Sequence, residues 1–365
     1  MTGMVTGGLD VVEEVSGRGI PAWGYALGGP RVGSAPGAST RGTLWVSLPR
    51  ASEGIERLLL SIGVFVDHDV RPPISWKLIV DGVSVFREFR PQFQVETDWG
   101  VYMKAIYDVK PILSRRVIER ETHKIVVIRD AVKPVRIADA VLYARYSSEK
   151  GVYSVSYWTG AVALEPGEGY QVNANLGRSM EGRRRAGVIV HSPYHDASFR
   201  VIAGGSRPEA AVGEGSHYIE ASIPYKGSPV PVYIRYEDPG YRFYPRIAVV
   251  SDVFVAEVKA PEPRPRLVVE KVSVTDSRVA IEGYVENVGD DVLEPSMLVV
   301  LALGVRLAKK KLPRLEPGGK ASFQVEFTID RLPIRPSRAN VRLVWRRLGE
   351  TRIVSKEISL ASGPS

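Results

Sequence analysis

From Gly42 onward the chain consists of short β-branched runs separated by proline, glycine and aspartate, as β-strands require. The clearest runs span residues 43–49, 58–66, 75–80, 99–109, 123–129 and 135–146. No segment keeps apolar residues at the i, i+3, i+4, i+7 spacing for three turns, so any helix is expected to be short. The sequence therefore predicts an all-β fold.

Two short sequence segments also occur twice in the chain. Residues 63–66 and 75–82 are echoed by residues 187–190 and 198–205, and weaker matches follow in the same order. One of these pairs Arg136-Ile137-Ala138 with Arg246-Ile247-Ala248. The preserved order predicts two copies of one β-module and places Trp76 and Phe199 in equivalent, buried strands. Two unrelated sandwiches, or one large one, are the alternatives.

Composition narrows the class of protein. A chain of 365 residues is long enough for two or three domains, and no apolar run reaches the ~18 residues of a transmembrane helix. No secretory signal is visible at the N-terminus, which favours a cytoplasmic location by default. Cysteine is absent, which excludes disulfides, thiol chemistry and cysteine zinc sites. Arginine outnumbers lysine 35 to 14, as expected of a thermophile or of a GC-rich genome.

Changes in composition suggest the domain boundaries. Residues 1–41 are rich in glycine and lack a sustained period, which predicts an irregular arm or an extended lead-in strand. Residues 42–150 and 151–259 hold the two repeats. Residues 260–266 alternate proline with other residues and predict a semi-rigid linker. Residues 267–365 form the third segment.

Each repeat resembles a galactose-binding-like jelly-roll module. In the first copy, Ile137-Ala138-Asp139-Ala140-Val141 has the form of the closing strand of such domains, whereas the second copy has Asp252 further along. The resemblance implies two tandem jelly-roll-like β-sandwiches; it says more about fold than about ligand.

Two motifs carry a second resemblance in the last segment. Val285-Glu286-Asn287-Val288-Gly289 is a strand that runs into a turn, and Leu315-Glu316-Pro317-Gly318-Gly319 precedes the strand at 321–327. Together they resemble the CARDB-type immunoglobulin-like domain of prokaryotic surface and adhesion-related proteins. This resemblance implies a C-terminal immunoglobulin-like β-sandwich and a cell-surface or virion location.

Two polar clusters are the candidate metal ligands. Asp67 and Asp69 follow one repeated strand, and His191, His195 and Asp196 follow its echo. Carboxylates and imidazoles at these positions could bind a divalent cation. Solvated loop residues are the alternative interpretation, and otherwise no cofactor is expected.

Aromatic and basic residues supply the remaining candidates. Tyr241, Phe243 and Tyr244 follow a predicted exposed turn and are candidate ligand-binding residues for a glycan. Residues 264–365 carry 18 Lys and Arg against 12 Asp and Glu, which makes this segment a candidate for polyanion binding. The basic runs 183–185, 309–311 and 346–347 otherwise fit a solvated surface.

No catalytic signature is present: the sequence has no G-x-S-x-G elbow, H-E-x-x-H motif or P-loop. The expected function is that of a non-enzymatic structural or adhesive protein whose partners are other proteins or further copies of itself. The N-terminal arm could donate a strand to a neighbouring subunit. A carbohydrate-binding protein is the alternative, and a hydrolase that uses the loops of Asp67 and His195 is a third hypothesis.

Overall fold

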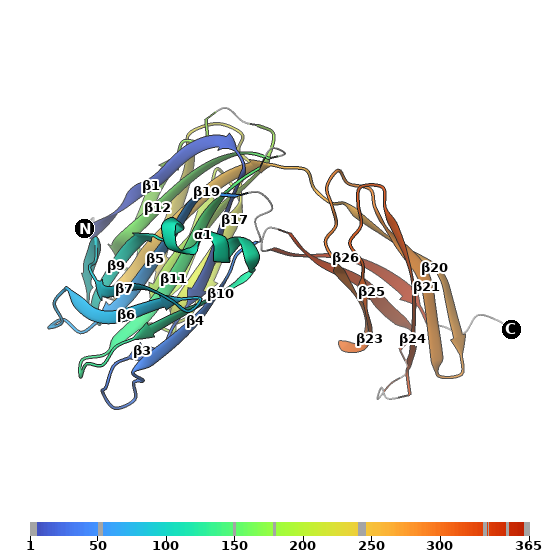
Figure 1. Cartoon of the computed structure of the whole chain (residues 1–365), viewed down its shortest axis with the longest axis horizontal. Coiled ribbons are helices and arrows are strands. Elements are labelled where there is room, and N and C mark those ends of the chain that lie inside the picture. The colour runs from blue at the N-terminus through green and yellow to red at the C-terminus, as the bar shows by residue number, and fades with distance from the viewer. Residues whose placement is uncertain are drawn as a thin grey trace. The chain divides into compact units, whose positions relative to one another are not determined.

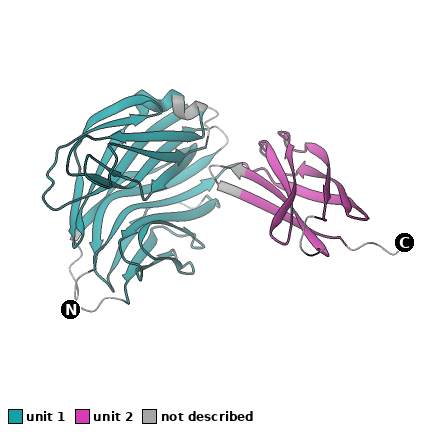
Figure 2. Cartoon of the chain, turned by 90° about the horizontal axis from the view of Figure 1, so that it is seen from below, with its two compact units in different colours: residues 1–260 teal, residues 261–365 magenta. Residues whose placement is uncertain are grey.

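The computed structural model describes residues 6–49, 54–148, 151–177, 180–239, 246–330, 334, 336–347 and 350–360. The chain divides into two compact units, residues 1–260 and residues 261–365 (Figure 2). Strands predominate among the described residues, which confirms the predicted all-β fold. In the described parts of the chain there is one helix, α1 (Lys110–Glu119). No described helix is long and apolar enough to cross a membrane.

Two sheets form the first half of the first unit (Figure 1). Its outer sheet has the order β4-β10-β6-β7, with strands β4 (Arg41–Ser47), β10 (Thr122–Ile128), β6 (Ile74–Val80) and β7 (Val83–Phe89). Its inner sheet has the order β2-β11-β5-β9-β8, with strands β2 (Ile20–Leu27), β11 (Val135–Ser147), β5 (Gly54–Val66), β9 (Gly100–Asp108) and β8 (Phe93–Thr97). The two-residue β3 (Arg31–Val32) also pairs with β11.

Two further sheets form the second half. The inner sheet has the order β1-β12-β19-β14-β17, with strands β1 (Thr6–Arg18), β12 (Val152–Leu164), β19 (Ala248–Lys259), β14 (Arg183–Ser192) and β17 (Gly215–Ser222). The outer sheet has the order β13-β18-β15-β16, with strands β13 (Gly169–Ala174), β18 (Val230–Glu237), β15 (Ser198–Ala203) and β16 (Glu209–Val212).

The two halves share one topology. The inner order β2-β11-β5-β9 matches β12-β19-β14-β17, and the outer order β4-β10-β6-β7 matches β13-β18-β15-β16, strand for strand. The repeated text lies in the matching strands β5 and β14 and in β6 and β15. This common order supports the internal duplication inferred from the sequence, and Trp76 and Phe199 are both buried in matching strands as expected.

The four sheets stack as layers, so each inner sheet is covered on both faces. One apolar core fills the space within each half, and further apolar clusters join the two inner sheets. Coverage on both faces explains the sequence pattern: β5 is buried without interruption from Leu58 to Val66, whereas the outer strand β4 alternates between exposed and buried residues. The two predicted jelly-roll segments are therefore joined into a single compact unit.

The glycine-rich N-terminal segment is part of this unit and not a free arm. β1 pairs with β12 of the second half, from Thr6 opposite Ala163 to Arg18 opposite Val152, whereas β2 pairs with β11 of the first half. Gly19 joins the two strands at φ +134°, and a Cβ there would lie 2.3 Å from the carbonyl oxygen of Tyr146. The segment thus crosses from one inner sheet to the other and ties the halves together.

The repeated glycine has a packing reason in both halves. In β5, a Cβ on Gly63 would lie 2.1 Å from the hydroxyl of Tyr102 on the neighbouring strand β9. In β14, a Cβ on Gly187 would lie 2.3 Å from the hydroxyl of Tyr218 on β17. Each glycine therefore makes room for a tyrosine on the neighbouring strand. This shared packing explains why both copies of the repeated sequence begin with glycine.

The later match between Arg136-Ile137-Ala138 and Arg246-Ile247-Ala248 misaligns the strands. The first tripeptide lies inside β11, whereas β19 only begins at Ala248. Counted from the strand starts, Asp139 and Asp252 are both the fifth residue, and each lies next to a register shift against β5 or β14. Asp252 is thus not displaced along its strand as the sequence comparison suggested.

In its described residues the second unit is a separate seven-stranded β-sandwich, with the three-plus-four arrangement of immunoglobulin-like domains. One sheet has the order β20-β21-β24, with strands β20 (Pro265–Thr275), β21 (Arg278–Asn287) and β24 (Lys320–Thr328). The other has the order β23-β22-β25-β26, with strands β23 (Val305–Leu312), β22 (Ser296–Ala302), β25 (Arg338–Arg347) and β26 (Glu350–Ser359).

Asn287 links the two sequence motifs of the second unit. Its buried side chain accepts hydrogen bonds from the backbone N–H groups of Arg264 and Gly289, at 3.1 and 3.2 Å, and donates to the carbonyl of Leu315 at 3.2 Å. The backbone carbonyl of Asn287 also accepts a hydrogen bond from the backbone N–H of Gly318. Residues 262–266, which the sequence analysis assigned to the linker, are therefore bonded to this unit, and β20 already begins at Pro265.

Candidate functional site

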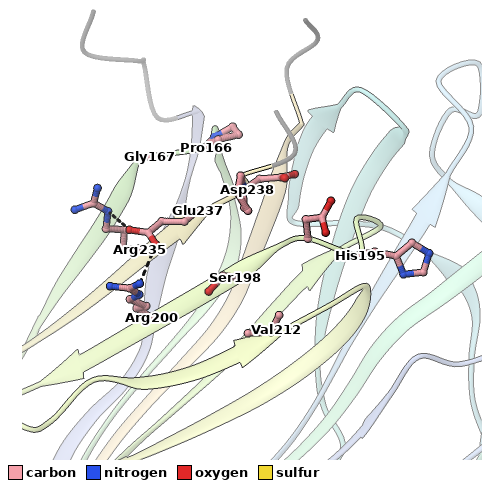
Figure 3. A pocket seen from close by; sticks show the side chains of 11 residues that line it. Pro166, Gly167, His195, Ser198, Arg200, Val212, Arg235, Glu237 and Asp238 are labelled. Atoms are coloured by element: carbon pink, nitrogen blue, oxygen red, sulfur yellow. Dashed lines mark ion pairs between the residues drawn. The ribbon is translucent and has the colours of Figure 1, made fainter. Parts of the chain in front are cut away.

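A shallow pocket of about 690 Å³ opens on the solvent-facing side of the second half's outer sheet (Figure 3). Its floor comes from Ser198 and Arg200 of β15, Val212 of β16, and Arg235 and Glu237 of β18. Residues between these on β15 and β18 point the other way into the core, since neighbours in a strand face opposite sides. The floor is therefore an outward-facing array of alternate residues.

Glu237 holds the two arginines of the floor. Its carboxylate lies 3.3 Å from Nη2 of Arg200 and 3.2 Å from Nε of Arg235 (Figure 3). Arg200 and Arg235 are directly opposite each other in the β15–β18 register, a placement that repels like charges. One carboxylate between two guanidinium groups offsets part of this repulsion and leaves one positive charge in excess on the floor itself, while the rim adds the carboxylate of Asp196.

Loops form the rim of the pocket, and the charge at one part of it is already compensated. The rim residues are Pro166, Gly167, His195, Asp196, Asp238 and Pro239. Asp238 is 7% exposed and accepts hydrogen bonds from Nη1 of Arg246, at 3.0 Å to each oxygen, and from the hydroxyl of Tyr236. The Arg246 guanidinium lies 4.6 Å from the centre of the Tyr194 ring. Asp238 is thus fixed in a neutralised pair.

The predicted aromatic ligand residues cannot be placed against this pocket. Tyr241, Phe243 and Tyr244 lie outside the described residues. They follow in sequence from Pro239, which is part of the rim.

The structure does not bring the five predicted metal ligands together. Asp67 and Asp69 are exposed in the loop after β5, where Asp69 pairs with Lys133 and this hydrogen bond lowers the Asp69 pKa. His195 pairs with Glu214 at 3.3 Å, and Asp196 lines the pocket. His191 is not in a loop but within β14 and is 1% exposed. Across the described ranges, no group of three or more His, Asp or Glu side chains could hold a metal ion.

His191 belongs instead to a buried polar cluster between the two inner sheets. We call it the buried joint and define it as Tyr102, Lys104, Asp139, Tyr157, His191 and Asp252, all of them at most 1% exposed. The ammonium of Lys104 in β9 donates to Asp139 in β11 at 2.7 Å and to Asp252 in β19. One lysine of the first half therefore binds one carboxylate from each half.

The remaining members satisfy the other carboxylate oxygens. Tyr102 donates to Asp139 at 2.7 Å, and Tyr157 donates to Asp252 at 3.0 Å. Burial raises the pKa of both tyrosines well above the usual value, so their hydroxyls stay protonated as donors. His191 brings Nε2 to 3.1 Å from Asp139 and Nδ1 to 2.8 Å from the Ser216 hydroxyl.

Charge pairing within the joint sets its protonation. Burial alone would raise the pKa of Asp139, but the adjacent Lys104 ammonium and the contact with His191 hold it well below its usual range. Burial alone would lower the pKa of Lys104, but Asp139 and Asp252 raise it. Asp139 and Asp252 thus share one ammonium group in a charge-assisted arrangement whose side chains are fully buried.

Sequence reasoning missed the joint and misassigned one basic run. Lys104 was the available signal, because it is a charged residue within the apolar run of β9, a strand that is almost wholly buried. Arg184, expected at a solvated surface, is 5% exposed. Its Nε donates to Glu257 at 2.9 Å, and its Nη1 donates to the carbonyls of Tyr225 and Gly227. In contrast, residues 309–311 lie in β23, at the edge of its sheet.

Comparison with known proteins gives no family. No protein-family model matches the sequence, and no curated protein matches it. Among solved structures, the chain resembles β-glucuronidases from Parabacteroides merdae (11% identity, TM-score 0.24, 57% of this chain and 27% of that one) and Bacteroides uniformis (14%, 0.22, 59% and 26%). A third, from Ruminococcus gnavus, gives 12% identity, TM-score 0.21 and coverage of 55% and 36%. The chain spans about a third or less of their length, and at these TM-scores the likeness supports no argument.

Proposed function

We propose that the chain is a non-catalytic structural or interaction protein whose first unit serves as a rigid body. The observation that carries this proposal is the buried joint. Its lysine, two aspartates, histidine and two tyrosines are the side-chain types that catalyse reactions elsewhere, yet here they are sealed from solvent and bonded to one another. A substrate cannot reach them, so their role is to hold the two halves together.

Rigidity follows from how the halves are joined. Apolar clusters and the joint occupy the same inter-sheet layer, and β1 adds a third connection by pairing with β12. Sliding one half over the other would separate the buried charges of Lys104 and Asp252, which is costly in a low-dielectric interior. A body of this kind is suited to presenting faces and sheet edges to partners.

The free edge of β1 is the surface we expect to make contacts between copies of the chain. β1 is a 13-residue strand at the end of its sheet, and β12 is the one strand that pairs with it among the described residues. An unpaired strand edge offers a row of backbone N–H and C=O groups to another strand. Val11 lies in this edge strand and is 55% exposed.

Replacing Val11 by lysine tests the proposal. Lysine on an edge strand opposes edge-to-edge pairing, so V11K should shift the sedimentation-velocity profile toward monomer without lowering the melting temperature. Val132 is 78% exposed in a loop, and V132K is the matched control that should leave the profile unchanged. A wild-type chain that stays monomeric at every concentration, or a V11K chain that assembles as before, would contradict this use of the edge.

Saccharide binding is the second candidate function, and the pocket on the outer sheet favours it. The pocket combines charged, hydroxyl and apolar side chains on an open sheet face, with a volume in the range of small-molecule sites. A glycan array probed with the full chain tests this function. If no saccharide on the array gives a signal, saccharide binding is ruled out and the structural proposal is unaffected.

A further inference from the structure

We infer that the pocket of the outer sheet binds an acidic saccharide, with the ligand's carboxylate held between Arg200 and Arg235. This inference rests on the saccharide-binding function proposed above and names its ligand class. It starts from the unequal charge of the pocket floor, where two guanidinium groups share the single carboxylate of Glu237.

Most donors of the two arginines are left for a ligand. A guanidinium group has five N–H donors in a fixed fork. Glu237 contacts Nη2 of Arg200 and Nε of Arg235, and among the residues that the structure describes it is the sole ion-pair partner of either. The side chains remain 55% and 48% exposed, so the other N–H groups are accessible from solvent.

Glu237 also positions the two guanidinium groups. Cross-strand register sets Arg200 opposite Arg235 and Ser198 opposite Glu237, so the carboxylate lies beside both arginines. A second carboxylate would bring the floor to two positive and two negative charges and would relieve the repulsion between the arginines. Planar carboxylates suit guanidinium forks because two parallel N–H···O bonds can form.

The rest of the pocket suits the sugar ring. Ser198 and Asp196 offer a hydroxyl and a carboxylate for sugar hydroxyls, and no ion pair of Asp196 is found among the described residues. Val212 is 68% exposed and gives apolar surface for the C–H face of a ring. Figure 3 shows the arginines on one side of the pocket and His195 on the opposite side, so the ligand is expected to lie with its acid group at the arginine side.

The test uses two probes that differ in one group. Methyl β-glucuronide carries a carboxylate where methyl β-glucoside carries a hydroxymethyl group, and titration calorimetry measures each against the full chain. We expect the glucuronide to bind at least about tenfold more tightly, since a hydrogen bond to a charged group is stronger than one between neutral groups. Inorganic sulfate, as a third probe, shows whether the arginines bind an anion without a sugar.

The variants assign the effect to the arginines. R235Q and R200Q should each weaken glucuronide binding about tenfold or more, whereas R235K, which keeps the charge but loses the fork, should recover part of it. R338Q is the matched control, because Arg338 also forms an exposed pair with a glutamate, Glu357 at 2.8 Å, in the second unit. Circular dichroism and the melting temperature confirm that each variant is folded.

Each outcome decides a separate question. Equal binding of glucuronide and glucoside, unchanged in R235Q, would overturn the acidic ligand and keep saccharide binding. Sulfate binding as tight as that of the glucuronide would overturn the saccharide part and keep an anion site. Failure of both sugars and of the glycan array would overturn the inference together with the saccharide function.

Discussion

The two halves of the first unit contain the same glycine–tyrosine pair but surround it with different chemistry. In the first half, the Tyr102 hydroxyl beside Gly63 donates to the buried carboxylate of Asp139. In the second half, the Tyr218 hydroxyl beside Gly187 accepts a hydrogen bond from Nε1 of Trp23 at 2.9 Å. We call the surroundings of Gly63 and Tyr102 the charged corner, and those of Gly187 and Tyr218 the aromatic corner.

A two-residue difference in strand register accounts for this contrast. Gly63 pairs with Asp139 across β5 and β11, whereas Gly187 pairs with Phe254 across β14 and β19, two residues beyond Asp252. A shift of two keeps every side chain on its original face, so the core is preserved while the neighbour changes. The Phe254 ring then stacks on Trp23 and Tyr157, at centroid distances of 4.9 and 4.3 Å.

The comparison shows where a duplicated sandwich is free to diverge. Both halves keep the strand order and the glycine, because these determine the fold of each half. The two inner-sheet surfaces that pack against each other differ between the halves, because each must be complementary to the other surface and not to a copy of itself. A buried ion pair adds little net stability compared with apolar packing but is costly to break, so we expect the joint to fix the alignment of the halves.

The largest effect should come from removing the cation of the charged corner. K104M leaves Asp139 and Asp252 buried without their shared ammonium, and breaking a buried pair in this way costs about 3–5 kcal/mol. Guanidinium unfolding, followed by near-ultraviolet circular dichroism and tryptophan fluorescence, measures the free energy of unfolding.

Two further variants interpret that result. K133M breaks the exposed pair of Lys133 with Asp69 and should leave the unfolding midpoint unchanged. The triple variant K104M/D139N/D252N removes all three charges and should recover a large part of the lost stability. If K104M unfolded at the wild-type midpoint, the joint would have no part in holding the halves together.

Alanine at each repeated glycine compares the two corners directly. In G63A the new methyl group would meet both Tyr102 and Asp139, at 2.1 and 2.2 Å, and Tyr102 is wholly buried. We expect a loss near the upper end of the about 1–3 kcal/mol typical of overpacking. In G187A the three nearest atoms all belong to Tyr218, which is partly exposed, so the loss should be smaller.

G8A provides the reference for these two variants, because a Cβ at Gly8 has no atom within 4 Å. Its melting temperature should match that of the wild-type chain. Equal losses in G63A and G187A would show that the charged neighbour of the first corner makes no difference.

The sequence predicted what depends on local pattern. Alternation and β-branched runs located β4, β5, β6, β9, β10 and β11 to within a few residues, because strand formation reflects neighbours two positions apart. The repeat also placed Trp76 in the core. The separation of a charged from an aromatic corner could not be predicted, since it depends on a register between strands that short matches do not fix.

The polar sites were harder to predict because their members are distant in sequence. Lys104 meets Asp139 and Asp252 across 35 and 148 residues. His191 was expected in a loop, but β14 continues to Ser192 and directs its side chain into the joint. The pocket was partly within reach, since His195 and Asp196 were singled out, whereas Arg200 and Arg235 meet through strand pairing alone.

Lowering the pH should reduce the free energy of unfolding through Asp139, and comparison with D139N isolates this contribution. Because the folded-state pKa of Asp139 lies below its ordinary value of about 4, its contribution to stability is complete above that value and is lost progressively as the pH falls from that value through the lower folded-state pKa. The free energy of unfolding of the wild-type chain, measured from pH 7 to pH 3, should therefore fall more steeply than that of D139N. Lys104, Tyr102, His191 and Asp252 face this carboxylate and are common to both proteins.

The slope should be reduced in D139N but not abolished. Burial alone would raise the pKa of Asp81 and Glu257, yet hydrogen bonds from His123 and Arg184 lower it, so both carboxylates add to the acid sensitivity of either protein. At the second corner, by contrast, Phe254 lies opposite Gly187 where Asp139 lies opposite Gly63, and the carboxylate that Tyr218 contacts is that of Glu220 at 3.4 Å, which is partly exposed. Y218F should therefore change the slope less than D139N does. Identical slopes in D139N and the wild-type chain would mean that the difference between the two corners is one of packing and not of charge.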